Sequence, residues 1–289
     1  MDFFQPGSLK EALEIKRERP EAVPLAGGTD VMVELNFDRR RPDAIVDLTR
    51  VPELHQWSSE NGRVRLGAGV TYSAVIAELA SDLPGLAIAS RTVGSPQIRN
   101  RGTIGGNLGT CSPAGDALPP LVAVEAQVEL TSTRGTRLLR LGDFMTGPKR
   151  NALEPDELIS AASIPRARGP QQFSKIGTRN AMVIAVASFA LAVDAVDRKI
   201  GTGIGSAGPV ILRASEAESW LEGVLEQDDL WESRREIKDS AADRFGELVA
   251  QTARPIDDVR GSARYRHHAV AVMARRTLSW AWDDYRRRL

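Results

Sequence analysis

Two glycine-rich segments of this 289-residue chain combine bare backbone with hydroxyl and amide side chains. The first is Ala26-Gly27-Gly28-Thr29, and the second is Thr103-Ile104-Gly105-Gly106-Asn107. Glycine lets main-chain N–H groups approach an anion closely, so each segment is typical of phosphate binding. Neither carries the Lys-Ser/Thr pair of a P-loop, and the second also lacks the full spacing of the dinucleotide fingerprint. Together they predict a diphosphate that is held from two sides.

The elements around these segments would place them at the ends of regular structure. Residues 22–25 are typical of a buried strand, and residues 31–37 of a helix that begins directly after the glycine turn. The positive end of that helix would add to the attraction of an anion. A helical stretch over 85–100 leads into the second segment.

The rest of the first half follows a mixed order of helices and strands. Ser8 and Glu11 have the spacing of a capping box and start a short helix that Pro20 ends. Thr71 is expected to cap a helix over 72–80. Further strands are expected over 43–48, 62–69, 121–132 and 136–144.

The second half begins after a candidate linker over 163–173, which is rich in Pro, Gly and Arg. Residues 181–196 and 199–209 predict a hairpin, and the remainder is expected to be helical. The clearest amphipathic helix runs from Ser262 to the end of the chain. It carries Trp280, Trp282 and Tyr285 beside Arg286, Arg287 and Arg288, which would either dock the helix on its own domain or contact another subunit.

Composition excludes several classes of function. Lysine plus arginine and aspartate plus glutamate number 38 each, so no global charge favours nucleic acid or an anionic membrane. The N-terminus is charged where a signal peptide would be apolar, and no run reaches membrane-spanning length, so we expect a cytoplasmic protein. One cysteine and three histidines exclude a disulfide within the chain and a four-cysteine cluster, and we expect no metal site. Cys111 has no neighbouring base in sequence and is expected to be a packing residue.

The segment "GIGSAG" (203–208) has the spacing of a dinucleotide fingerprint. Pro209 follows it at once, and no helix of a parallel βαβ unit is evident behind it. We therefore assign no nucleotide to this segment.

The order "AGGTD" (26–30), then "TIGGNLGTCSPAGD" (103–116), then "DVRGSARYRHHAVAVMARRTL" (258–278) resembles the FAD-binding medium subunit of the molybdenum hydroxylases, the xanthine dehydrogenase and carbon monoxide dehydrogenase family. The resemblance covers nearly the whole chain. It implies an α+β fold with a two-lobed FAD-binding domain of the vanillyl-alcohol oxidase (PCMH) type over 1–170. A smaller α+β domain, like the C-terminal domain of the carbon monoxide dehydrogenase flavoprotein, would follow over 171–289.

The resemblance also implies the residues that contact FAD. An aspartate nine positions after the asparagine of the second segment touches the nucleotide in the family, and Asp116 stands there. Lys175 would place a fixed cation near the flavin or its phosphates. Arg99 and Arg101 flank the second segment and would add positive potential. The full set is Leu25, Ala26, Gly27, Gly28, Thr29, Asp30, Val31, Met32, Thr103, Ile104, Gly105, Gly106, Asn107, Asp116, Leu158 and Lys175.

In such a complex the organic substrate is hydroxylated elsewhere. The resemblance implies a large subunit with the molybdopterin cofactor, a small subunit with two [2Fe–2S] clusters, and a dimer of heterotrimers. FAD on this chain would take electrons from the clusters and pass them to NAD⁺ or another acceptor, without a dedicated catalytic side chain. "AGGTD", in place of the "AGGHS" or "AGGQS" variants, favours purine or related N-heterocycle substrates. The alternatives are the medium subunit of a carbon monoxide or aldehyde dehydrogenase, a self-sufficient flavin oxidase, and a non-catalytic nucleotide-binding module.

Overall fold

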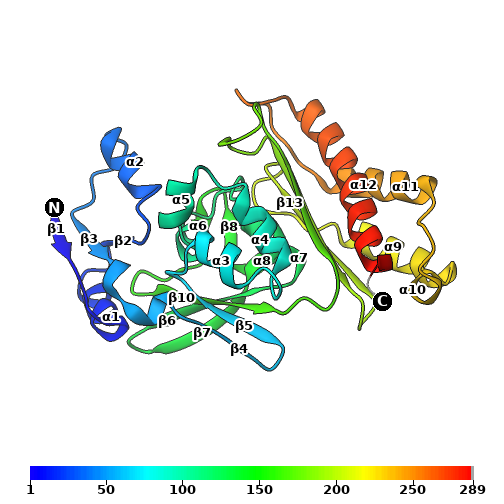
Figure 1. Cartoon of the computed structure of the whole chain (residues 1–289). Coiled ribbons are helices and arrows are strands. Elements are labelled where there is room, and N and C mark those ends of the chain that lie inside the picture. The colour runs from blue at the N-terminus through cyan, green and yellow to red at the C-terminus, as the bar shows by residue number, and fades with distance from the viewer. Residues whose placement is uncertain (288–289) are drawn as a thin grey trace.

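The computed structural model describes residues 1–287, and its N-terminal lobe is a small parallel sheet (Figure 1). The strands β1 (Asp2–Phe4), β2 (Val23–Leu25) and β3 (Ala44–Asp47) pair in the order β1-β3-β2. The helix α1 (Leu9–Glu18) is capped as expected, because the Ser8 hydroxyl accepts a hydrogen bond from the Glu11 amide at 3.2 Å. The short helix α2 (Val31–Asn36) connects β2 to β3.

The second lobe is a five-stranded antiparallel sheet in the order β4-β5-β10-β6-β7. Its strands are β4 (Trp57–Glu60), β5 (Arg63–Gly67), β6 (Gln127–Ser132), β7 (Gly135–Arg140) and β10 (Leu158–Pro165). The helices beside it are α3 (Tyr72–Glu78), α4 (Pro84–Arg91), α5 (Pro96–Arg101), α6 (Ile104–Thr110), α7 (Leu118–Ala123) and α8 (Leu141–Phe144). Short 3₁₀ helices (Leu48–Arg50 and Pro52–His55) and the pair β8 (Met145–Gly147) and β9 (Arg150–Asn151) complete the lobe. One hydrophobic core joins both lobes.

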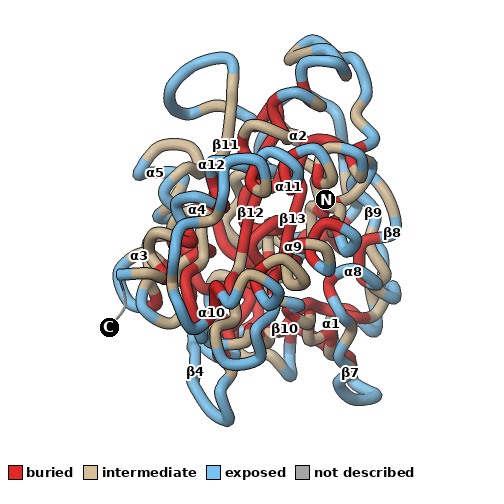
Figure 2. The backbone as a smooth tube through the Cα atoms, turned by 90° about the vertical axis from the view of Figure 1, so that its right-hand side faces the viewer, coloured by how far each residue is buried: buried red, intermediate tan, exposed pale blue. Residues whose placement is uncertain are grey.

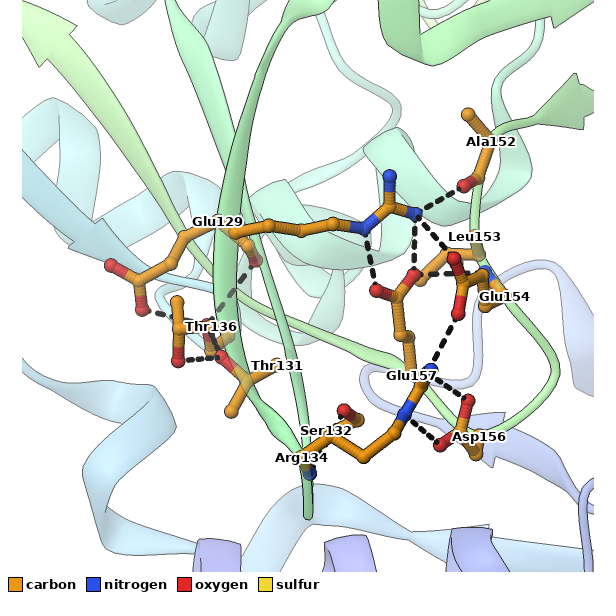
Figure 3. Close-up of polar contacts among 12 residues, drawn as sticks. Glu129, Thr131, Ser132, Arg134, Thr136, Ala152, Leu153, Glu154, Asp156 and Glu157 are labelled. Atoms are coloured by element: carbon orange, nitrogen blue, oxygen red, sulfur yellow. Dashed lines mark hydrogen bonds and ion pairs between the residues drawn. The ribbon is translucent and has the colours of Figure 1, made fainter.

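An ion-pair network fastens the β6–β7 hairpin to the segment that leads into β10 (Figure 3). Arg137 donates to both carboxylate oxygens of the buried Glu157, at 2.6 and 2.8 Å. Arg134, at the turn of the hairpin, pairs with Glu154 and Asp156. The hydrogen bonds from Arg137 hold the pKa of Glu157 below its usual value.

The second domain is a three-stranded antiparallel sheet between two sets of helices (Figure 1). Its strands are β11 (Gln171–Ile176), β12 (Ala187–Asp194) and β13 (Lys199–Gly205), and its helices are α9 (Ser215–Gln227), α10 (Leu230–Ser233), α11 (Asp239–Thr252) and α12 (Ala263–Arg287). β12 and β13 are buried almost throughout, as Figure 2 shows in red. The helices α9 and α12 of the same domain pack on this sheet, and the helices α4 and α7 of the first domain also contact it.

The glycines of the "GIGSAG" region serve this packing between domains. A Cβ at Gly203 would lie 2.7 Å from the carbonyl carbon of Pro119 in α7, and closer still to its oxygen. A Cβ at Gly201 would lie 3.0 Å from the carbonyl carbon of Ala123, the last residue of α7, and closer to its oxygen. The glycines therefore let α7 approach β13 backbone to backbone, which accounts for them without a nucleotide.

Several predicted elements need correction. Residues 121–132 were expected to form one strand, but 121–123 belong to α7. Pro119 and Pro120 favour a helix start, and a short apolar run does not distinguish a helix from a strand. The helical stretch over 85–100 is two helices, because Gly94 adopts a positive φ of 44° and Ser95 caps the new helix α5. The strand expected over 136–144 ends at Arg140, where α8 begins. No strand was predicted at the positions of β1, β4, β8, β9, β10 and β11.

The expected linker over 163–173 is shorter than predicted. β10 extends to Pro165 and β11 begins at Gln171, so that only 166–170 lie between strands. This connection is tied to both domains, because Arg166 pairs with Asp82 and Arg168 pairs with Asp194. The link between the domains is therefore short and held at both ends.

The predicted C-terminal helix is confirmed as α12, and it docks mainly on its own domain. Trp282 and Tyr285 are buried in the second core beside Trp231, and the Tyr285 hydroxyl donates to the Trp231 carbonyl at 2.9 Å. Trp280 is 48% exposed. Arg288 lies outside the described residues.

Candidate functional site

The first glycine segment is an open loop between β2 and α2. Gly28 adopts a positive φ of 76°, which turns the chain from the strand into the helix. Within residues 1–287, no hydrogen bond takes up the amide groups from Gly27 to Val31. The hydroxyl of Thr29 and the first turn of α2 lie beside these amides in the chain. Several adjacent free N–H groups at a turn are the arrangement that binds phosphate oxygens.

The second glycine segment differs, because its amides already have partners. Thr103 caps α6, its hydroxyl accepting from the Gly106 amide at 2.9 Å. The amides of Ile104 and Gly105 donate to the carbonyls of Val70 and Ala68, at 3.1 and 2.8 Å. The segment was expected to bind mostly through its backbone, yet these three amides are not available for an anion. Its remaining contribution is the side chain at its end, Asn107.

The two segments are held side by side. A Cβ at Gly27 would lie 2.5 Å from the carbonyl carbon of Arg101, so only glycine permits this approach of the first loop to the entry of the second. At the far end of α6, the Thr110 hydroxyl donates to the Asp30 carboxylate at 2.8 Å. Tyr72 is buried against Gly102, and burial together with the charges of Asp116 and Asp30 raises its pKa. The two segments are therefore in contact, and their joint binding of one diphosphate stays a prediction.

Two buried acceptor atoms in this region have no hydrogen-bond partner. They are Oδ1 of Asn107 and Oδ1 of Asp116. The two residues are close, because Gly115 packs against the Asn107 side chain so tightly that a Cβ there would lie 2.9 Å from Nδ2. Buried acceptors normally have partners, and unpaired ones mark sites where a ligand or water belongs. Two such acceptors suit the hydroxyl groups of a sugar or sugar alcohol.

Asp116 also joins the two domains. Its Oδ2 atom accepts from Lys175 Nζ, on β11 of the second domain, at 2.5 Å. Thr92, which follows α4, lies 3.3 Å from the same oxygen. Burial raises the pKa of Asp116, and the Lys175 ammonium opposes that shift. Lys175 is therefore held by a carboxylate at the boundary between the domains, and its position near the flavin stays a prediction.

The remaining predicted residues are placed as follows. Leu25 and Ala26 lie at the end of β2, and Met32, which is exposed on α2, follows the open loop. Leu158 is 1% exposed in the first core, so it offers almost no surface to a ligand. Cys111 is a buried packing residue, as expected, and burial raises the pKa of its thiol to about 11.

The flanking arginines have separate roles. Arg99 donates to the carbonyls of Val93 and Gly94, each at 3.1 Å, and so fixes the turn before α5. Arg101 contributes its carbonyl group to the contact with Gly27, and its side chain is exposed. Thr92, Thr110 and Tyr72 were missed, since single threonines and tyrosines carry no sequence signature of a site.

Comparison with known families decides the assignment. Residues 1–167 match the model of the FAD binding domain in molybdopterin dehydrogenase, and residues 172–281 match the CO dehydrogenase flavoprotein C-terminal domain. The chain belongs to the FAD-binding medium subunits of the molybdenum hydroxylases. Its α+β fold is that of the family, with an FAD-binding domain followed by the flavoprotein C-terminal domain.

Relatives of this family share most of their length with the chain. The nicotinate dehydrogenase FAD-subunit of Eubacterium barkeri is 36% identical over 77% of this chain and 79% of the relative. The nicotine 6-hydroxylase medium subunit of Paenarthrobacter nicotinovorans is 29% identical over 96% and 95%. The carbon monoxide dehydrogenase structure from Hydrogenophaga pseudoflava superposes with a TM-score of 0.88 at 26% identity, covering 99% of this chain and 98% of the other. The chain is therefore similar to flavoprotein subunits of molybdenum-containing dehydrogenases along its whole length.

The residues present suit FAD chemically. The open amides from Gly27 to Val31 match a diphosphate, and the unpartnered acceptors of Asn107 and Asp116 match ribityl or ribose hydroxyls. Within residues 1–287, no group of three or more His, Cys, Asp or Glu side chains could hold a metal ion. No helix in the described part of the chain is long and apolar enough to cross a membrane.

Proposed function

We propose that this chain carries FAD between an iron–sulfur subunit and a terminal electron acceptor. In this proposal the clusters of a small subunit supply single electrons, and NAD⁺ or another acceptor receives them in pairs. Substrate hydroxylation takes place on a large molybdopterin subunit, and the assembly is a dimer of heterotrimers. We also propose a domain boundary at 170/171, where the connection after β10 ends and β11 begins.

The observation that carries the proposal is that unpaired donors and unpaired acceptors lie on two segments that contact each other at Gly27 and Arg101. The first loop offers unpartnered donors, and Asn107 and Asp116 offer unpartnered acceptors. A dinucleotide with a diphosphate and a polyhydroxyl chain needs both kinds of group, in separate places. Bound FAD exchanges electrons singly or in pairs, which suits a link between one-electron and two-electron carriers.

The chain's own residues would bind and orient the cofactor. The Gly27–Val31 amides would fix the diphosphate, while Asn107 and Asp116 would accept hydrogen bonds from hydroxyl groups. Lys175 would lie beside the cofactor, because its side chain is buried at the boundary between the domains and pairs with Asp116. These roles include no proton transfer by a side chain, in agreement with an electron-transfer subunit.

The substrate proposal rests on two observations. The first loop reads "AGGTD", which by its resemblance to the family we take to favour N-heterocycle substrates. Two of the relatives are named for nicotinate and nicotine. Both of those compounds contain a nitrogen heterocycle. We propose a purine or related N-heterocycle as the substrate of the complex.

The test is the composition of the complex that this chain forms. A tagged chain purified from its host should bring down a molybdenum subunit and an iron–sulfur subunit, with about one FAD for each copy of the chain. Bound flavin should be reduced by an N-heterocycle only when both partners are present. A chain that reduced its own flavin with an organic substrate would instead be a self-sufficient oxidase. A chain without flavin in an intact complex would disprove the proposal.

A carbon monoxide or aldehyde dehydrogenase is the second candidate, because the carbon monoxide dehydrogenase fold covers 99% of this chain. Flavin reduction in the same purified complex distinguishes this candidate from an N-heterocycle hydroxylase. Flavin reduction by carbon monoxide or an aldehyde, with none by N-heterocycles, would favour this candidate.

A further inference from the structure

Thr92, which lies outside the predicted site, contacts both members of the buried pair between the domains. Its hydroxyl oxygen lies 3.3 Å from Oδ2 of Asp116. Its carbonyl oxygen accepts a hydrogen bond from Nζ of Lys175, also at 3.3 Å. The Asp116 and Lys175 side chains are each 8% exposed, so water cannot easily replace these contacts.

Thr92 is itself held in place at the end of α4. Its amide and its hydroxyl both donate to the carbonyl of Ala89, at 3.0 and 2.7 Å. The hydroxyl proton is thus shared between that carbonyl and the Asp116 carboxylate. The following turn is fixed by the hydrogen bonds of Arg99 to the carbonyls of Val93 and Gly94. Thr92 therefore offers a rigid contact to the carboxylate.

Both contacts to Asp116 fall on the same oxygen. Lys175 and Thr92 lie on Oδ2, and Oδ1 is buried without a partner. The two oxygens of a carboxylate are chemically equivalent, so Lys175 alone could hold either oxygen or both. A second contact on the same oxygen favours the orientation in which Oδ2 faces Lys175 and Oδ1 keeps no partner within the chain.

We propose that Thr92 is a positioning residue that keeps Oδ1 of Asp116 free to accept a hydrogen bond from a hydroxyl group of the flavin nucleotide. The inference rests on the proposed function, because it concerns the same cofactor site. Thr92 acts through Asp116 and makes no chemical step of its own. By fixing the Asp116 carboxylate before FAD binds, Thr92 lowers the entropy cost of ordering that side chain on binding.

The experiment measures FAD affinity of the complex after its flavin has been removed. Thr92→Val keeps the shape of the side chain and loses the hydroxyl, and Thr92→Ser keeps the hydroxyl. We expect Thr92→Val to weaken FAD binding roughly fivefold, the effect of one hydrogen bond, and Thr92→Ser to stay within about twofold of wild type. Thermal unfolding of each flavin-free complex shows whether the variants are folded.

A second background separates positioning from general stability. In Asp116→Ala, or Asp116→Asn if that complex assembles better, Thr92→Val should weaken FAD binding no further. Equal FAD affinity of Thr92→Val and wild type would overturn the inference. The inference would also fail if Thr92→Val weakened FAD binding just as much in the Asp116 variant, or if Thr92→Ser bound FAD as weakly as Thr92→Val. If the wild-type complex takes up no FAD at all, the proposed function fails instead.

Discussion

The backbone of Gly27 lies directly against the carbonyl group of Arg101, with no room for a side chain between them. This contact joins the loop that offers free amides to the helix that leads into the second glycine segment. Residues from separate parts of the sequence therefore form one site only because position 27 has no Cβ.

Gly27→Ala should abolish cofactor binding. The new Cβ would lie 2.5 Å from the Arg101 carbonyl carbon, and a backbone atom cannot rotate away as a side chain can. The measurement is the flavin content of the purified complex. Gly142→Ala is the matched control, because a Cβ there meets nothing within 4 Å. Full flavin content in Gly27→Ala would show that the loops do not need this approach.

Gly203→Ala should weaken the packing of the two domains. Its Cβ would lie 2.7 Å from the Pro119 carbonyl carbon, whereas a Cβ at Gly223 meets nothing within 4 Å. Overpacking of this kind costs about 1–3 kcal/mol, and Gly223→Ala in α9 should be neutral or slightly stabilising. Denaturant unfolding of the two variants measures the difference. If both unfold like wild type, β13 does not depend on its glycines.

Trp282→Ala should lower the stability of the chain far more than Trp280→Ala. Trp282 is buried among Trp231 and Tyr285 in the second core, and Trp280 is 48% exposed. Removal of a buried tryptophan costs about 3–5 kcal/mol, and an exposed one roughly 0.5 kcal/mol or less. Thermal unfolding should therefore separate the two variants clearly. Loss of complex assembly in a stably folded Trp280→Ala would instead identify that residue as a subunit contact.

The Arg137–Glu157 pair should contribute stability that depends on pH. Arg137 lowers the pKa of Glu157 in the folded chain below the value of about 4.3 for a free glutamate. The stabilisation is therefore present above that unfolded pKa and is lost as the pH falls through the lower folded pKa. Glu157→Gln should unfold more easily than wild type at neutral pH, and the difference should shrink below about pH 4. A difference that does not change with pH would contradict this assignment.

Much of the architecture could be predicted because it depends on local signals. The cap of α1 at Ser8, the β12–β13 hairpin and the long helix α12 all follow from residue patterns that act within a few positions. The two glycine segments were also singled out from their composition. Their partnership became visible only in space, at Gly27 and Arg101.

What the sequence could not show depends on partners that are distant in the chain. Residues 121–123 at the end of α7 were expected to belong to a strand, because the helix start depends on two prolines within an apolar run. The amides of Ile104 and Gly105 are occupied by carbonyls some 35 residues earlier, so the second loop offers less backbone than its composition indicates. Thr92 has no motif at all, and its contacts at Asp116 and Lys175 exist only because two domains meet there.

The most direct test of the central claim compares FAD with FMN on the flavin-free complex. The free amides of the first loop are assigned to a diphosphate, which FAD has and FMN lacks. Several charge-assisted hydrogen bonds, each about 1.5–3 kcal/mol, should make FAD bind at least roughly a hundredfold more tightly. Equal affinity for the two flavins would contradict the assignment of the loop from Gly27 to Val31 as the diphosphate site.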